Sequence, residues 1–334
     1  MFFGFPKNDL DDIFSSCSHV WPSLEDSNIL VMGGTGFVGK WLVASLGYAQ
    51  LAGIKLKITV LSREPSAYSD AYSVEGVKIS WIKLDVAKDS DLDVKKFTHV
   101  INAATPSSAR TGAIQPSYVY NSIVLGNKLV LKAPYKKDFR YILLSSGAVS
   151  HLETIEPTFE RHKCEANHLD TLPTAYAHGK RFAEMDIEKA VVQDGLNAQS
   201  LRLYAFAGPG LPLDQHFAAG NFIRDFLDTG SIEIKGNPET QRSYMYPTDL
   251  AMHILRSLIL NVTNTQEVGS SEVVSMRELA SRICEGVNSL PVREGDFKQP
   301  LSSYFPKSEN LLGQTVSLDE SIKRWKNWLL FPRN

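Results

Sequence analysis

The 334-residue sequence predicts an α/β protein, in which helices cover both faces of an open, doubly wound parallel sheet and a smaller domain follows toward the C-terminus. Two features carry this prediction. Short apolar runs typical of buried strands recur up to residue 204, and most are separated by stretches long enough for a helix, as parallel crossovers require. The first of these runs ends in a group of glycines, which precedes a stretch with helical periodicity.

Residues 1–27 are expected to form an N-terminal helical extension. Apolar residues recur there at i, i+3, i+4 and i+7 spacing, which favours an amphipathic helix docked on the body of the protein. They are Leu10, Ile13, Phe14, Cys17, Val20 and Trp21. We interpret this stripe as a packing surface, and binding of a partner is the alternative.

Six segments read as strands of one sheet domain over residues 28–204: 29–32, 57–61, 77–84, 98–102, 141–144 and 200–204. The pattern then becomes irregular, with Gly-Pro-Gly at 208–210, several short segments and a last helical stretch at 318–329. We therefore expect residues 205–334 to form mainly a substrate-binding lid over the sheet, with some segments that return to it.

Composition and charge exclude several classes of protein. The chain has 43% apolar, 10% aromatic and 22% charged residues, which is ordinary for a globular protein. A formal net charge of -2 gives no reason to expect nucleic acid or an anionic membrane as a partner. We find no long apolar stretch and no secretory signal, so a cytoplasmic protein is expected.

The three cysteines are Cys17, Cys164 and Cys284. Their number is odd and their spacing matches no zinc site, so we expect reduced thiols and no bound metal.

Gly33, Gly36 and Gly39 lie between the first expected strand and the first expected helix, with Phe37 and Val38 among them. Glycines let the chain turn tightly, let a pyrophosphate approach the backbone and let the helix pack on the strand. The helix N-terminus offers free N–H groups and partial positive charge to the anion. A strand before this motif and a helix after it predict dinucleotide binding by a Rossmann-type domain.

The end of the second strand, at Ser62 and Arg63, bears on the choice of cofactor. A carboxylate at this turn would pair with the ribose hydroxyls of NAD and repel a 2′-phosphate. Here the turn carries an arginine, whose planar guanidinium suits a phosphate. The sequence therefore favours NADP, while NAD stays possible and Arg63 as a simple surface cation is the alternative.

Tyr176 and Lys180 are expected one turn apart on the same face of a helix. A nearby ammonium would lower the pKa of the phenol and make it usable as an acid or base. Ser146 supports a catalytic interpretation of this pair. It lies 30 residues upstream of Tyr176 at the carboxyl end of an expected strand, where open parallel sheets bind ligands.

With these motifs in order, residues 28–330 resemble the extended short-chain dehydrogenase/reductase superfamily, which contains nucleotide-sugar epimerases, dehydratases and 4-keto reductases. The resemblance rests on GGTGFVG at 33–39, LDV at 84–86, NAA at 102–104, SSGAV at 145–149, YAHGK at 176–180 and QRSYMYPTDLA at 241–251.

The resemblance implies a role for each matching residue. Ser146 would hydrogen-bond the reacting oxygen, Tyr176 would exchange its proton, and Lys180 would hold the nicotinamide ribose. Other positions would serve the cofactor: Asp85 and Val86 would contact its adenine end, while Ala103, Ala104 and Thr105 would line the dinucleotide groove.

The resemblance also implies contacts to the diphosphate of a nucleotide sugar. Arg242 matches a position where related enzymes place an arginine on that diphosphate, a role that suits a bidentate charged donor. Asn221 resembles a second contact. The alternatives are a solvated surface charge for Arg242 and a turn or helix cap for Asn221.

Several positions depart from the family pattern. Dehydratases carry an Asp-Glu pair after the catalytic hydroxyl and decarboxylating relatives keep a glutamate, whereas this chain has Gly147 and Ala148. Elimination and decarboxylation therefore lack their acid/base groups. Ser150, Ala205 and Ile123 also replace usual family residues, which leaves the identity of the substrate open.

The expected function is hydride transfer between NADP(H) and a sugar carbon of a nucleotide sugar. Arg63 favours a 4-keto-sugar reductase, because reductive pathways usually use NADPH, and a 4-epimerase that recycles its cofactor is the alternative. A redox-sensing protein without turnover and a reductase of non-nucleotide carbonyls are further alternatives. The resemblance also implies a homodimer.

Overall fold

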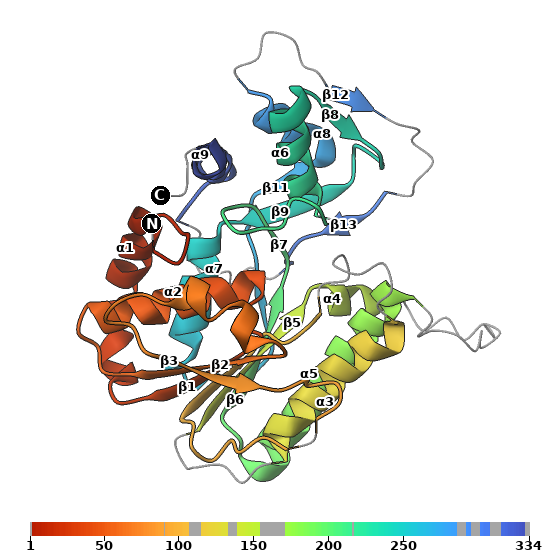
Figure 1. The fold of residues 1–334 in the computed structure, drawn as a ribbon. Coiled ribbons are helices and arrows are strands. Elements are labelled where there is room, and N and C mark those ends of the chain that lie inside the picture. The colour runs from red at the N-terminus through yellow and green to blue at the C-terminus, as the bar shows by residue number, and fades with distance from the viewer. Residues whose placement is uncertain are drawn as a thin grey trace, which may run out of the picture.

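The structure is a computed structural model, and it describes residues 2–89, 91–106, 115–132, 139–153, 171–215, 217–285, 292–294, 301–307 and 315–330. Within these residues the molecule has two lobes (Figure 1). The lower lobe is built on a large sheet, and the upper lobe contains smaller sheets and short helices.

The large sheet has seven parallel strands in the order β10-β6-β5-β4-β1-β2-β3, which confirms the predicted fold class. The strands are β1 (Asn28–Met32), β2 (Lys57–Ser62), β3 (Ile79–Lys83), β4 (His99–Asn102), β5 (Arg140–Ser146), β6 (Ala198–Leu203) and β10 (Gln266–Val268). The first six lie within a few residues of the segments expected from the sequence. β5 is buried along its whole length, because helices cover both of its faces.

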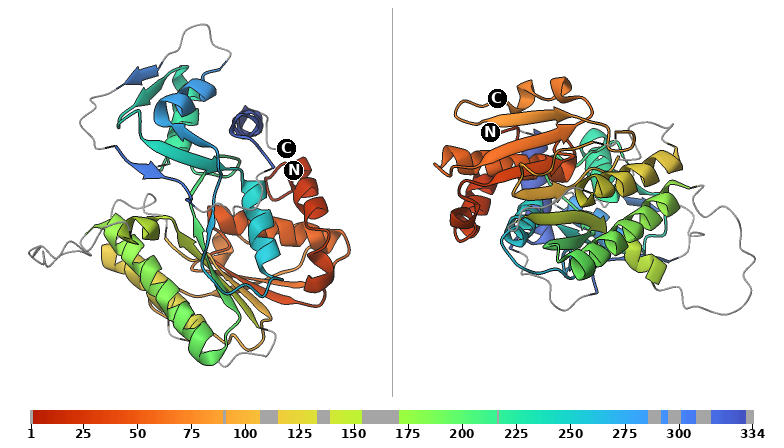
Figure 2. Two further views of the ribbon diagram at one scale, coloured as in Figure 1. Left: turned by 180° about the vertical axis from the view of Figure 1, so that it is seen from behind. Right: turned by 90° about the horizontal axis from the view of Figure 1, so that it is seen from below.

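Two helical layers enclose this sheet (Figures 1 and 2). On one face lie α3 (Pro116–Leu131) and α5 (Leu172–Asp194), whose apolar side chains share a core with β4 and β5. On the other face lie α2 (Phe37–Leu51) and α7 (Pro247–Ser257), with α1 (Lys7–Ser16) packed against both. α2 is buried almost all round, because the sheet and these two helices together surround it.

The upper lobe has its own apolar core. β9 (Gln241–Met245) lies between β11 (Val273–Ser275) and β13 (Ser303–Tyr304), and it also pairs with β7 (Ala205–Phe206). The remaining elements of this lobe are α6 (Ala218–Thr229), β8 (Ile232–Ile234), α8 (Met276–Ile283), β12 (Val292–Glu294) and α9 (Leu318–Leu330). Short helices complete the lower lobe: η1 (Trp21–Leu24), η2 (Pro65–Ala67), η3 (Asp70–Tyr72) and α4 (Ala148–Glu153).

The apolar stripe near the N-terminus is divided between two elements. α1 ends at Ser16, and a separate 3₁₀ helix begins at Trp21. Pro22 explains the break, because a proline ring within an α-helix clashes with the carbonyl four residues earlier. The stripe nevertheless packs as expected, since Leu10, Ile13 and Trp21 are all buried.

The N-terminal segment also connects the two ends of the chain. Asp9 of α1 is only 2% exposed, and its carboxylate accepts hydrogen bonds from the Tyr246 hydroxyl at 2.6 Å and from Arg324 of α9 at 2.8 Å. The Trp328 indole donates to the Gly4 carbonyl at 2.8 Å. The two termini accordingly lie side by side in Figures 1 and 2.

We expect Arg324→Met to lower the free energy of unfolding by roughly 2–3 kcal/mol at pH 7, because it leaves the buried Asp9 carboxylate without its cation. The partial exposure of Arg324 keeps the loss below that of a fully buried pair. Burial raises the pKa of Asp9, and Arg324 opposes that rise. The loss should therefore shrink as the pH falls through the pKa of Asp9, because a protonated carboxyl needs no cation. Urea unfolding at pH 7 and pH 5 measures this, with the exposed Lys323→Met as control. An equal loss at both values would contradict the assignment.

Among the residues that the structure describes, no helix is both long enough and apolar enough to cross a membrane. Cys17 and Cys284 are buried free thiols, and Cys164 lies outside the described residues.

Candidate functional site

The glycine-rich turn joins β1 to α2. Gly33 has a φ of +75°, and a Cβ placed on it would lie 2.6 Å from the Ala103 carbonyl oxygen. A Cβ on Gly39 would lie 2.3 Å from the Gly33 carbonyl oxygen. Side chains are thus excluded where the turn, the loop after β4 and the first turn of α2 meet. The turn has the backbone that a dinucleotide cradle requires.

α2 begins at Phe37, and its N-cap residue, Gly36, supplies no side-chain cap. The first turn of such a helix presents free N–H groups that can donate hydrogen bonds to an anion. Phe37 and Val38 are half-buried, and the Phe37 ring packs on Phe206 with 5.8 Å between centroids. The start of α2 therefore contacts the base of the upper lobe through this pair of rings.

Arg63, at the end of β2, is exposed and hydrogen-bonded to a neighbouring helix. Its guanidinium donates to the Tyr118 hydroxyl at 3.2 Å, and that hydroxyl lies 3.0 Å from both carboxylate oxygens of Asp85. The structure thus brings the predicted Arg63 and Asp85 together through Tyr118 of α3. The sequence contained no motif that marked Tyr118.

Other residues predicted for the cofactor follow the ends of neighbouring strands. Ser62 is buried and its hydroxyl accepts from the Glu64 amide at 3.3 Å, while Val86 is buried in the core under α3. Ala103, Ala104 and Thr105 are half-buried in the loop after β4. That loop is held by Asn102, whose side-chain oxygen accepts from the Ala104 amide at 3.1 Å.

Tyr176 and Lys180 lie one turn apart on α5, as their spacing predicts. The Lys180 ammonium donates to the Leu144 carbonyl of β5 at 2.5 Å and lies 5.7 Å from the centroid of the Tyr176 ring. Burial lowers the pKa of Lys180 to about 8, and nearby Glu184 acts in the opposite direction. The ammonium is therefore fixed on the backbone of the strand that carries Ser146.

The expected lowering of the Tyr176 pKa is not what the structure gives. Burial raises the pKa of this phenol, and the opposing effect comes from a hydrogen bond with Ser146. Sequence spacing revealed the proximity of Lys180 but not the depth at which the phenol lies, and burial disfavours the phenolate.

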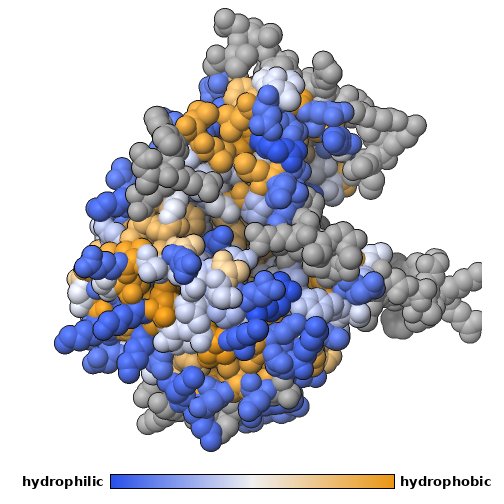
Figure 3. Space-filling view, viewed as in Figure 1, coloured by the Kyte–Doolittle hydropathy of each residue, from blue (hydrophilic) through white to orange (hydrophobic). Residues whose placement is uncertain are grey.

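Ser146 is the last residue of β5, and two further groups hold its hydroxyl. The Ala148 amide donates to Ser146 Oγ at 3.1 Å, and the Tyr304 hydroxyl lies 3.0 Å from the same atom. Tyr304 comes from β13 of the upper lobe, which faces α4 of the lower lobe in Figures 1 and 2. On this side the surface is hollowed between the lobes (Figure 3). No sequence motif indicated Tyr304.

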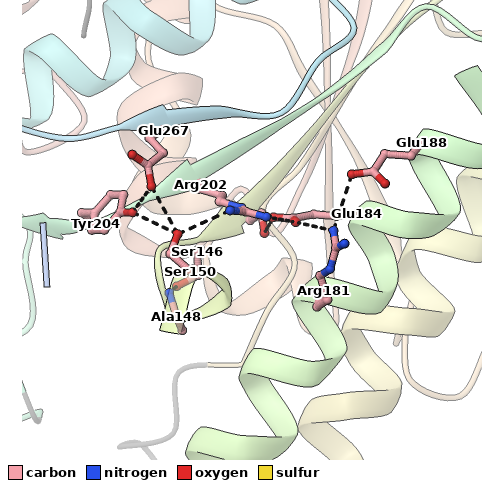
Figure 4. Close-up of polar contacts among 10 residues, drawn as sticks. Ser146, Ala148, Ser150, Arg181, Glu184, Glu188, Arg202, Tyr204 and Glu267 are labelled. Carbon is pink, nitrogen blue, oxygen red and sulfur yellow. Dashed lines mark hydrogen bonds and ion pairs between the residues drawn. The ribbon is translucent and has the colours of Figure 1, made fainter. Parts of the chain in front are cut away.

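A network of polar side chains lies behind this group (Figure 4). The fully buried Glu184 carboxylate accepts from Ser145 Oγ at 2.5 Å and from Arg202 at 3.0 and 2.8 Å. The Arg202 guanidinium also lies 3.4 Å from Ser150 Oγ, which donates to Glu267 of β10 at 3.2 Å. These bonds, with Ser150 of α4, connect α4, α5, β5, β6 and β10 next to Ser146.

Tyr204 explains why residue 147 is a glycine. A Cβ on Gly147 would lie 2.3 Å from Cε1 of the Tyr204 ring. That ring is buried, and its hydroxyl donates to the Glu267 carboxylate. A side chain at residue 147 would therefore require that ring to move. With alanine at 148, neither position offers an acid or a base.

The two predicted diphosphate contacts have different surroundings. Arg242 is half-buried, donates to the Gln241 carbonyl at 2.8 Å and lies 5.6 Å from the centroid of the Tyr304 ring. It is thus one side chain away from Ser146. Asn221 lies in the first turn of α6 and accepts from Arg224 at 3.3 Å, so it is not the helix cap, which is Phe217.

An open cavity of about 570 Å³ lies at the opposite edge of the sheet. Its lining includes Asn28 and Lys57, which are the first residues of β1 and β2. Ligands of open parallel sheets bind beyond the carboxyl ends of the strands. This cavity is therefore separate from the edge that carries the glycine turn and Ser146.

The sequence matches the family model described as "NAD dependent epimerase/dehydratase family" over residues 29–267. A UDP-glucuronic acid decarboxylase 1 of Xenopus tropicalis is 24% identical over 268 residues, which cover 78% of this chain and 60% of that protein. This chain therefore spans about three fifths of the length of that relative.

Solved structures share the fold. A UDP-N-acetylglucosamine 4-epimerase from Methanobrevibacter ruminantium superposes with a TM-score of 0.72 at 19% identity, covering 92% of this chain and 99% of the other. The enzyme WbmF of Bordetella bronchiseptica, in complex with NAD+ and UDP, gives a TM-score of 0.68 at 17% identity and covers 92% of each chain.

Proposed function

The chain belongs to the NAD dependent epimerase/dehydratase family, and within that family we propose that it transfers a hydride at a carbon of a nucleotide sugar. The observation that carries this proposal is the gathering of Ser146, Tyr176 and Lys180 at the edge of the sheet that holds the glycine cradle. A bound nicotinamide cofactor would supply the capacity to accept or donate the hydride.

Residues of the chain would supply proton transfer, hydrogen bonding and cofactor binding. Tyr176 would exchange a proton with the reacting oxygen, and Ser146 would hydrogen-bond that oxygen. Lys180, anchored on the Leu144 carbonyl, would place a positive charge beside the phenol and oppose the effect of burial on its pKa when the sugar is bound. Gly33, Gly36 and Gly39, with the start of α2, would hold the pyrophosphate of the cofactor.

Among reactions of this family, reduction or epimerisation at C4 fits the site better than decarboxylation or dehydration. The latter two need an acid/base group after the catalytic hydroxyl, and Gly147 and Ala148 supply none. We favour a 4-keto-sugar reductase, because Arg63 suits NADPH, and a 4-epimerase is the second candidate. Arg242, close to Ser146 through Tyr304, supports a diphosphate-bearing substrate over a simple carbonyl.

One assay separates these reactions. The purified protein is incubated with NADPH or NAD⁺ and, in turn, UDP-4-keto-6-deoxyglucose, UDP-glucose, UDP-N-acetylglucosamine and UDP-glucuronic acid. A reductase oxidises NADPH only with the keto sugar, and an epimerase interconverts a sugar without net change in cofactor. We expect no release of carbon dioxide from UDP-glucuronic acid; such release would contradict our interpretation of residues 147 and 148.

We further propose that NADP is the preferred cofactor. Arg63→Ala should weaken NADP(H) binding by roughly 1.5–3 kcal/mol, the range for a hydrogen bond to a charged group, and should change NAD(H) binding little. Fluorescence titration measures both affinities. Lys88→Ala is the matched control, because Lys88 is an exposed cation whose ammonium lies 3.8 Å from Asp85. Equal losses for both cofactors would remove the reason for preferring NADP.

A homodimer is the assembly that we propose for this enzyme. The outer surfaces of α3 and α5 expose large apolar side chains, namely Leu125, Phe182 and Met185, at 38%, 40% and 50%. Light scattering should give twice the 37.1 kDa mass of the chain, and Met185→Glu should reduce it toward the monomer mass. A monomeric native protein would contradict this assembly.

A further inference from the structure

Tyr304 connects the upper lobe to the catalytic serine. It lies on β13 in register with Arg242 of β9, and its hydroxyl reaches Ser146, which is 158 positions away in the sequence. The ring is held on two sides: its centroid is 5.0 Å from that of Tyr204 and 5.6 Å from the Arg242 guanidinium. The phenol is therefore placed by packing that does not depend on its hydroxyl.

Two groups hold the Ser146 hydroxyl in place. A serine hydroxyl has one proton to donate and two lone pairs to accept with. The Ala148 amide uses one lone pair at 3.1 Å. The Tyr304 hydroxyl lies 3.0 Å from Ser146 Oγ and donates to the Leu203 carbonyl at 3.3 Å, so this phenol links Ser146 to the end of β6.

The Ala148 amide and the Tyr304 hydroxyl thus hold Ser146 Oγ from two sides. Burial raises the pKa of Tyr176, and Ser146 is the group that opposes this rise. We propose that Tyr304 is a positioning residue for the reaction: together with the Ala148 amide it fixes the place of the Ser146 hydroxyl, which acts on the reacting oxygen beside Tyr176. This inference rests on the hydride-transfer function proposed above.

Removing only the hydroxyl tests the inference, because Tyr304→Phe keeps the ring between Tyr204 and Arg242. Tyr244→Phe is the matched control: Tyr244 is a buried phenol of β9 whose hydroxyl contacts the Met276 sulfur at 3.9 Å. Turnover is measured with the UDP-sugar that the native protein converts, in the native and Ser146→Ala backgrounds, with cofactor affinity and thermal stability recorded for each variant.

We expect Tyr304→Phe to lower kcat by roughly 5–10-fold, the scale of one net hydrogen bond, with KM and cofactor affinity nearly unchanged. In the Ser146→Ala background, Tyr304→Phe should cause no further loss of kcat, because Tyr304 acts on the reaction through Ser146. Tyr244→Phe should leave kcat unchanged in both backgrounds.

Results other than these would contradict the role of Tyr304, the role of Ser146 or the proposed function. An equal loss in both backgrounds, no loss at all, or a loss matched by Tyr244→Phe would refute the positioning role. Full activity of Ser146→Ala would instead refute the proposed catalytic group. No conversion of any sugar by the native protein would overturn the function and, with it, the inference about Tyr304.

Discussion

Replacing Tyr176 with phenylalanine is expected to reduce turnover by roughly 10²–10⁴-fold, the usual contribution of a general acid or base. The substitution removes the transferable proton and keeps the ring packed against α3 and the sheet. Cofactor affinity should survive, because the glycine turn and Arg63 are untouched. Single-turnover absorbance at 340 nm measures hydride transfer, and fluorescence titration measures binding.

Two comparisons make the Tyr176 result interpretable. Tyr244→Phe removes a buried phenol hydroxyl elsewhere and should retain full turnover. Lys180→Met should also reduce turnover, because it removes the ammonium that lies 5.7 Å from the Tyr176 ring. Unchanged turnover in Tyr176→Phe would mean that the Tyr176 and Lys180 pair is accidental and that another group exchanges the proton.

Replacing Arg242 with alanine is expected to reduce kcat/KM for the nucleotide sugar by roughly 10–150-fold, which corresponds to about 1.5–3 kcal/mol of lost charge-assisted bonding. Cofactor affinity should not change. Arg242→Lys should restore only part of the loss, because an ammonium keeps the charge without the two-pronged geometry. The assay compares a keto sugar with and without its nucleotide diphosphate.

The structure adds a second consequence of the Arg242 substitution, because the guanidinium also packs on Tyr304 and bonds Ser302 at 3.3 Å. A displaced Tyr304 would lower kcat/KM equally for both substrates, whereas a lost diphosphate contact would lower kcat/KM only for the nucleotide sugar. Arg277→Ala is a suitable control, because Arg277 pairs with Glu239 at 3.0 Å in the same lobe. Equal effects on both substrates would refute the diphosphate contact.

Much of the sheet could be predicted because its signals are local. A strand covered on both faces tends to be apolar along most of its length, and this is the pattern of β1 and of residues 141–144 in β5. The glycines of the first turn are required by backbone contacts such as the approach of residue 33 to Ala103. The one-turn spacing of Tyr176 and Lys180 likewise follows from helix geometry alone.

The parts that could not be predicted depend on contacts between distant segments. Tyr304 meets Ser146 only because a two-residue strand pairs with β9, and so short a segment has no periodicity of its own. Tyr118 reaches Asp85 across 33 positions, and Glu267 reaches Ser150 across 117. The Tyr176 pKa was misjudged for a related reason, since burial depends on the whole fold.

Isotope tracing shows whether the protein transfers a hydride to a sugar carbon. The protein is incubated with UDP-4-keto-6-deoxyglucose and NADPH that carries transferable deuterium on its nicotinamide ring, and the product is examined by NMR. We expect deuterium on C4 of the nucleotide sugar, and roughly 10²–10⁴-fold slower labelling when Tyr176→Phe replaces the native protein. An unlabelled nucleotide sugar, together with deuterium transfer to a simple ketone that lacks a nucleotide, would contradict this expectation.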